Sequence, residues 1–104
     1  MNKCCWCLIV SGKVQGVGFR GFIYDFVHNY NLLEGINNPI CGYVKNLNSG
    51  EVEIIAHGSY EGLEKLHEAA LLGPRLSKVD EVKVIKDYAI ENKFIEFEIM
   101  PSEP

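Results

Sequence analysis

The segment CWCLIVSGKVQGVGFRGFIYDFVHNYNLL (Cys5–Leu33) decides the fold, because a strand, a glycine turn and a helix follow one another in it. Residues 5–12 form a short apolar run that ends at glycine, which is typical of a buried strand. From about Arg20 to Leu33, apolar residues recur at helical spacing with polar residues between them. Between these elements lies VQGVGFRG (14–21), with its glycines spaced as GxGxxG. The segment therefore predicts a strand that turns sharply into an amphipathic helix.

The rest of the chain adds two strands, a helix and two more strands. We expect a loop at 31–41, strands at 42–47 and 51–56 around a hairpin turn at 48–50, a helix at 59–72, and strands at 79–85 and 94–99. Ser59 is the expected N-cap of this helix, and Gly73 and Pro74 end it. The order β-α-β-β-α-β-β predicts an α+β, ferredoxin-like split βαβ sandwich, an antiparallel sheet with two helices on one face.

Length and composition predict one ordinary globular domain spanning 1–104. Hydrophobic residues make up 47% of the 104 residues and charged residues 23%. No stretch approaches the roughly 18 unbroken apolar residues of a membrane span, so we expect no membrane association. No signal-like segment opens the chain, and the cytoplasm is the expected location. The net charge of −4 argues against a nucleic-acid partner, because such binding relies on basic side chains.

The four cysteines, Cys4, Cys5, Cys7 and Cys41, are expected to be free thiols. Cys4 and Cys7 form a CxxC pattern, but positions three apart on a strand lie ~10 Å from each other, beyond the ~7 Å reach of a disulfide. A zinc site would need a second ligand pair at suitable spacing, which the scattered histidines do not supply. We expect a reducing compartment, no metal and no cofactor.

The expected topology brings two polar side chains to one edge of the sheet. The first and second strands run parallel with the third between them, so the loop after the first and the end of the second emerge together. Arg20 and Asn46 should therefore converge. The start of the first helix lies there too, and its unpaired N–H groups and dipole favour an anion. A cation at this helix end is unfavourable unless an anion binds beside it.

The glycine turn admits three interpretations. A dinucleotide fingerprint needs a parallel βαβ unit and an acidic residue about twenty positions later, and the region near Cys41 has none. A plain turn stays open, because glycines between a strand and a helix need no ligand. Arg20 favours the third interpretation, an anion cradle, since a guanidinium can add a bidentate grip to backbone donors. Asn46 likewise is either a turn former or an amide that orients a water or a substrate oxygen.

At these residues the sequence resembles the acylphosphatase family. The matching motifs are VSGKVQGVGFR (Val10–Arg20) and GYVKNLNSGEVE (Gly42–Glu53), with a weaker match in GPRLSKVDEVKV (73–84). The resemblance covers nearly the whole chain. It implies a ferredoxin-like fold and metal-free hydrolysis of a small-molecule acyl phosphate to a carboxylate and inorganic phosphate. Phosphate or another small anion is then the expected product or inhibitor.

Carried over by position, the resemblance assigns roles to individual residues. Arg20 binds the phosphate and Asn46 orients the attacking water. The phosphoryl oxygens are cradled by the backbone N–H groups of Gln15, Gly16, Val17, Gly18 and Phe19. The chemistry agrees, because an acyl phosphate already has a weakly basic carboxylate leaving group and needs mainly positioning and charge stabilisation. The alternative is a non-catalytic anion-binding domain of the same fold, while RNA binding lacks both the aromatic signature and the basic charge.

Three features depart from the family pattern without removing a catalytic residue. Ser49 stands where many members have an aspartate before the hairpin glycine. The loop at 31–41 is longer than usual and carries Pro39. Gly21 follows Arg20 where a helix former is expected, at a cost of about 1 kcal/mol in helix stability.

Overall fold

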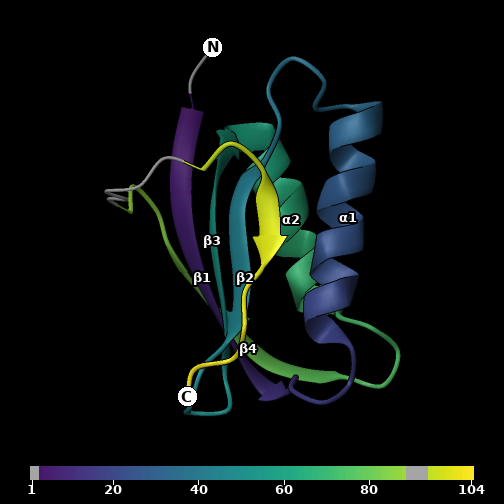
Figure 1. Ribbon diagram of the computed structural model, residues 1–104, viewed down its shortest axis with the longest axis vertical. Coiled ribbons are helices and arrows are strands. Elements are labelled where there is room, and N and C mark those ends of the chain that lie inside the picture. Colours follow the sequence, from purple (N-terminus) through teal and green to yellow (C-terminus); the bar gives the residue numbers. More distant parts are fainter. Residues whose placement is uncertain (1–2, 89–93) are drawn as a thin grey trace.

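The computed structural model describes residues 3–88 and 94–104 and contains two helices and five strands (Figure 1). In chain order these are β1 (Lys3–Lys13), α1 (Phe19–Leu33), β2 (Cys41–Asn46), β3 (Val52–Ser59), α2 (Tyr60–Leu72), β4 (Lys78–Ile85) and β5 (Phe97–Ile99). The predicted order of elements is confirmed.

The strands form one sheet in the order β4-β1-β3-β2-β5. β1 pairs antiparallel with β3 and β4, and β2 pairs antiparallel with β3, as predicted. β5 departs from the expected antiparallel sheet, because it lies parallel to β2. β4 and β5 occupy opposite edges, so the chain crosses the sheet between them and enters the far edge in the direction of β2 (Figure 1).

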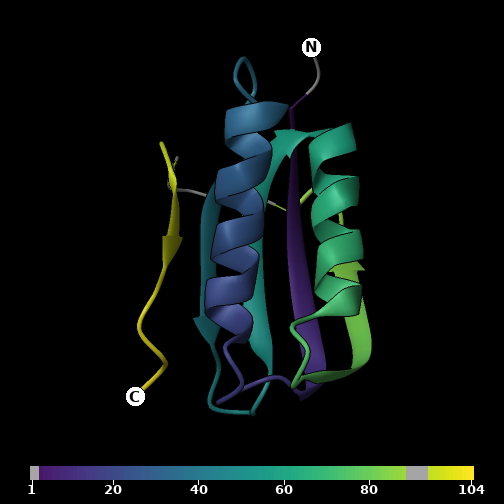
Figure 2. The same cartoon turned by 90° about the vertical axis from the view of Figure 1, so that its right-hand side faces the viewer.

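Both helices pack on the same face of the sheet, as predicted (Figure 2). Alternate strand residues point toward them, since successive side chains of a strand face opposite sides. The core formed in this way includes Trp6, Leu8, Val10, Val44, Val52, Ile54 and Ala56 from the strands and Ile23, Val27, Leu63, Leu66 and Ala70 from the helices. These residues are at most 1% exposed and hold the strand ends that carry the site in a rigid frame.

Two local signals act as the sequence predicts. Gly50 closes the β2–β3 hairpin at φ 96°, a conformation that glycine adopts without strain. The Ser59 hydroxyl accepts a hydrogen bond from the Gly62 backbone N–H at 2.9 Å and caps α2. Both features depend on residues only a few positions apart.

The last strand is shorter than the predicted 94–99. The Phe94 carbonyl oxygen lies 3.1 Å from Nε2 of His57, and the Phe94 ring packs edge-to-face on Tyr43. These contacts hold Phe94 over the sheet face that the helices leave open, so the chain joins the edge of β2 only where Gly42 N–H donates to Glu96. Phe94 thus packs on the open face of the sheet and does not extend β5.

The cysteines are free, as expected. Cys4 and Cys5 are half-buried, and Cys7 and Cys41 are buried. In the part of the chain that the structure describes, neither helix has the length and apolar character needed to cross a membrane.

Candidate active site

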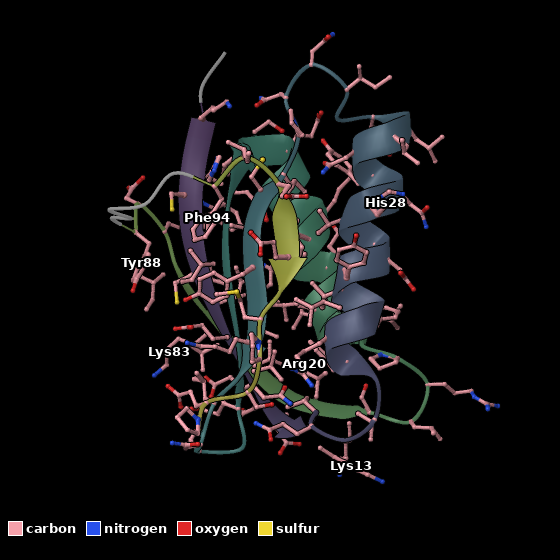
Figure 3. All side chains as sticks on the ribbon, in the orientation of Figure 1. Lys13, Arg20, His28, Lys83, Tyr88 and Phe94 are labelled. Carbon is pink, nitrogen blue, oxygen red and sulfur yellow. The ribbon has the colours of Figure 1, made fainter. Side chains whose placement is uncertain are left out.

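Arg20 and Asn46 line one cleft, although they lie on different elements. The cleft has a volume of about 220 Å³ and is bounded by Val14, Gly16, Gly18, Phe19, Arg20, Gly21, Asn46 and Ile99. Arg20 comes from the first turn of α1 and Asn46 from the last residue of β2. Their convergence confirms what the parallel course of β1 and β2 predicts. Figure 3 shows Arg20 at this end of the molecule, beside the chain that leaves β5.

The glycine turn forms one wall of the cleft with Gly16 and Gly18. Gly16 and Gly18 have φ angles of 75° and 81°, which side-chain-bearing residues adopt only with strain. Gly18 is the N-cap of α1, yet no side chain caps this helix and its first turn holds no acidic residue. The first N–H groups of a helix have no partner within the helix, and the helix dipole adds positive potential at this end. Such a helix start favours an anion.

Only three of the five residues of the expected cradle line the cleft. Gly16, Gly18 and Phe19 line the cleft, whereas Gln15 and Val17 are not among its lining residues. Val17 packs against the core instead. The part of Gln15 and Val17 in anion binding stays a prediction.

Gln15 ties the glycine turn to the β2–β3 hairpin. Its side-chain Nε2 donates to the main-chain oxygens of Leu47 and Glu51, at 2.8 and 2.9 Å. Asn46 directly precedes Leu47, so this pair of bonds sets the distance between the turn and the amide across the cleft. Sequence reasoning considered only the backbone of Gln15, and its side-chain role depends on a partner more than thirty residues away.

The Arg20 guanidinium is half-buried and held from one side. Nη1 donates to the main-chain oxygen of Met100 at 2.9 Å. A guanidinium has five N–H donors in a planar fork, so this bond orients the group and leaves other donors for a second partner. Met100 follows β5, and no sequence signal pointed to it.

Asn46 is also contacted by the C-terminal segment. Its Nδ2 donates to the hydroxyl of Ser102 at 3.3 Å, and its main-chain oxygen accepts from the Glu103 N–H at 3.0 Å. Asn46 follows Val44 by two positions, so its side chain leaves β2 on the helix-facing side, toward Arg20. The amide thus faces the cleft with one hydrogen engaged.

Three other basic side chains, Lys13, His28 and Lys45, do not line the cleft. The Lys45 ammonium sits 5.6 Å from the centre of the Tyr43 ring, on the opposite face of the sheet. His28 is exposed and stacks on Tyr24, further along α1 (Figure 3). Lys13 lies at the same end of the molecule as Arg20 (Figure 3). Within residues 3–88 and 94–104, no group of three or more His, Cys, Asp or Glu residues could hold a metal ion.

Comparison with known proteins identifies the family. The family model for acylphosphatase matches residues 6–99, most of the chain. The chain belongs to the acylphosphatase family. An acylphosphatase from Vibrio cholerae serotype O1 is 40% identical over 100 residues, which cover 96% of this chain and all of the relative. One from Bacillus subtilis is 37% identical over 84 residues, 81% of this chain and 84% of that protein.

Solved structures agree with this acylphosphatase assignment. The crystal structure of acylphosphatase from Bacillus subtilis superposes with a TM-score of 0.79 at 33% identity, over 93% of this chain and 98% of that one. Full-length HypF in a phosphate- and nucleotide-bound form also superposes with a TM-score of 0.79, at 28% identity, over 97% of this chain but 12% of HypF. The α+β ferredoxin-like fold and the assignment to a family of hydrolases are therefore both established.

Proposed function

We propose that this acylphosphatase hydrolyses a small acyl phosphate to a carboxylate and inorganic phosphate without a metal. The observation that carries the proposal is the shared cleft, in which Arg20 and Asn46 face the glycine turn from different elements. The Arg20 guanidinium and the start of α1 would bind the phosphoryl group, and the Asn46 amide would orient the water. Phosphate and other small anions are the proposed product and inhibitors, and the net charge of −4 argues against nucleic acid as a partner.

The phosphoryl group is proposed to sit on the turn from Gln15 to Phe19. Backbone N–H groups at the start of α1 would surround its oxygens, and Arg20 would grip two of them with the donors that Met100 leaves unused. Such donors are fixed before the substrate arrives, so they stabilise the transition-state charge without reorganising. Gln15 supports this arrangement by holding the turn against the hairpin.

Asn46 is proposed to orient the attacking water. A side-chain amide accepts a hydrogen bond from water through its oxygen, which aims a water lone pair at the phosphorus. Asn46 cannot take up a proton, so the water's proton passes to an oxygen of the substrate's own phosphoryl group. The P–O bond to the acyl group breaks as the water oxygen bonds to phosphorus, and the electron pair leaves with the carboxylate. This leaving group is weakly basic and needs neither a general acid nor a Lewis acid.

The cytoplasm is the proposed location. Cys7 and Cys41 are buried and free, and Cys4 and Cys5 are free and half-buried. Free thiols persist in a reducing compartment, whereas secreted domains of this size tend to form disulfides.

Hydrolysis of benzoyl phosphate in EDTA tests the proposal. We expect turnover by the wild type and a loss of about 10²–10³-fold in kcat/KM for Arg20→Ala, the typical cost of removing a preorganised donor to a developing anion. A similar loss is expected for Asn46→Ala, with a smaller effect on phosphate inhibition because the cradle remains. Circular dichroism and urea unfolding establish that each variant is folded.

Two matched variants remove an arginine and an asparagine outside the cleft, and so show what the loss of such a side chain does by itself. Arg75→Ala removes the other arginine of the chain, an exposed residue after α2, and Asn29→Ala removes an exposed asparagine on α1. Both should keep wild-type kcat/KM. If the folded wild type binds phosphate but does not hydrolyse benzoyl phosphate, the protein is a non-catalytic anion-binding domain and the proposal is wrong.

A further inference from the structure

The segment after β5 continues along the edge of β2 as far as the cleft. The Met100 N–H donates to the Val44 oxygen at 2.9 Å, and two positions further along β2 the Asn46 oxygen accepts from the Glu103 N–H at 3.0 Å. Figure 2 shows this segment running beside β2 beyond the end of β5. Its main chain therefore follows β2 to the residue that carries the amide of the cleft.

Ser102 is fixed in this segment from both sides. Pro101 precedes it and restricts the backbone, since its ring locks φ. After it, the Glu103 carboxylate accepts from the Asn48 N–H at 2.8 Å, which anchors the segment to the β2–β3 hairpin. The Ser102 hydroxyl then lies 3.3 Å from Nδ2 of Asn46. The position of this hydroxyl is set by main-chain bonds before and after it, rather than by its own side-chain rotamer alone.

We propose that Ser102 is a positioning residue for hydrolysis and holds the Asn46 amide with its oxygen turned to the water. This inference rests on the proposed function of Asn46. Ser102 is not among the residues that line the cleft, and it would act through its hydrogen bond to the Asn46 amide.

The orientation of the Asn46 amide matters because Oδ1 accepts hydrogen bonds whereas Nδ2 donates them. Oδ1 accepts a hydrogen from water and leaves a water lone pair free to attack. Nδ2 in the same place would donate to that lone pair and withdraw it from the reaction. In the structure the Ser102 oxygen accepts from Nδ2, which leaves Oδ1 for the water. Ser102 is exposed, so solvent can satisfy the hydrogen of its hydroxyl. Loss of the hydroxyl frees the amide to rotate and flip.

The test compares Ser102→Ala and Ser102→Thr with the wild type on benzoyl phosphate. We expect Ser102→Ala to lower kcat about three- to tenfold, the size of one neutral hydrogen bond, with the inhibition constant of inorganic phosphate unchanged. Ser102→Thr keeps the hydroxyl and should retain most of the activity. Ser11→Ala is the matched control, because this serine lies on β1 and makes only a 3.5 Å contact with the Glu81 oxygen.

Two results would overturn the inference. One is an unchanged kcat in Ser102→Ala. The other is a parallel loss of phosphate inhibition that Ser102→Thr does not restore, since the segment would then support the phosphate cradle rather than the amide.

A second measurement separates this inference from the proposed function. In a 15N-labelled sample, the side-chain NH₂ signals of Asn46, assigned by their loss in Asn46→Asp, should shift in Ser102→Ala and stay in Ser11→Ala. An inactive wild type with this shift would contradict the proposed function and leave the Ser102 contact standing. Unshifted signals would contradict the Ser102 contact whatever the activity.

Discussion

The side chain of Gln15 donates to the main-chain oxygen of Leu47 at 2.8 Å and joins the glycine turn to the hairpin that carries Asn46. The same nitrogen donates to Glu51 across the hairpin. The side-chain amide of Gln15 therefore joins the two loops that form the cleft, and the distance between the glycine turn and Asn46 depends on it.

Substitution of Gln15 should affect both stability and activity. Gln15→Ala removes two hydrogen bonds, and we expect the free energy of unfolding to fall by about 1–2 kcal/mol. KM for benzoyl phosphate should rise because the turn loses its tether. Urea unfolding and steady-state kinetics measure the two effects. Gln15→Glu places a carboxylate against two carbonyl oxygens and should be less stable than Gln15→Ala; equal stability of the two variants with the wild type would contradict the tether.

Replacement by alanine should have opposite effects at Gly18, the N-cap of α1, and at Gly21, within α1. Gly18 has φ 81°, so Gly18→Ala strains the backbone by about 1–2 kcal/mol although the new methyl would meet no atom within 4 Å. Gly21 lies inside α1 with open space around it, so Gly21→Ala should raise the free energy of unfolding by about 1 kcal/mol. Urea unfolding of the two variants side by side measures this difference. A loss of stability in both would mean that Gly21 is needed for close packing.

Asn46→Asp tests the route of the water's proton. A carboxylate has no N–H for Ser102 and repels the phosphoryl group, so we expect kcat/KM for benzoyl phosphate to fall about 10²-fold or more. Circular dichroism checks the fold, and the inhibition constant of phosphate reports the repulsion. Full activity in this variant would mean that a base at this position accepts the proton, and would argue against transfer to the substrate's phosphoryl oxygen.

Stability should decrease between pH 9 and pH 11 in part because of Cys7. Burial raises the pKa of this thiol from its ordinary 9.0 to about 11, and the nearby Glu53 carboxylate and Cys5 add to the shift. Above pH 9 the unfolded chain releases the proton that the native state keeps, which favours unfolding by about 2–3 kcal/mol once both states ionise. Below pH 9 the Cys7 thiol is protonated in both states, so this loss of stability is absent.

Urea unfolding across pH 8–11 measures the effect. Cys7→Ala should show a shallower loss of stability with pH than the wild type, even if its stability at pH 8 is lower because of the smaller side chain. Burial also raises the pKa of Tyr43, with a further contribution from its bond to Glu53, so some slope remains in the variant. Equal slopes in the two proteins would contradict the assignment to Cys7.

Several features of the fold and of the site could be predicted because their causes are local. The glycines of the turn, the Ser59 cap and the Gly50 hairpin act on residues within a few positions. Period-two and helical patterns then set the order of the elements. That order alone placed Arg20 and Asn46 at one edge, because parallel strands separated by one antiparallel strand end on the same side of a sheet.

Other features depended on contacts that the sequence pattern does not encode. Ser102 reaches Asn46 across 56 positions, and the side chain of Gln15 reaches Glu51 across 36. The parallel pairing of β5 with β2 and the shortened start of β5 follow from a crossover and from Phe94 packing over the sheet. The sequence by itself determined the order of the elements, the layers they form and the two side chains that meet in the cleft. Only the tertiary structure decided which groups hold them, because hydrogen bonds between distant segments depend on strand register and on the path of the chain between strands.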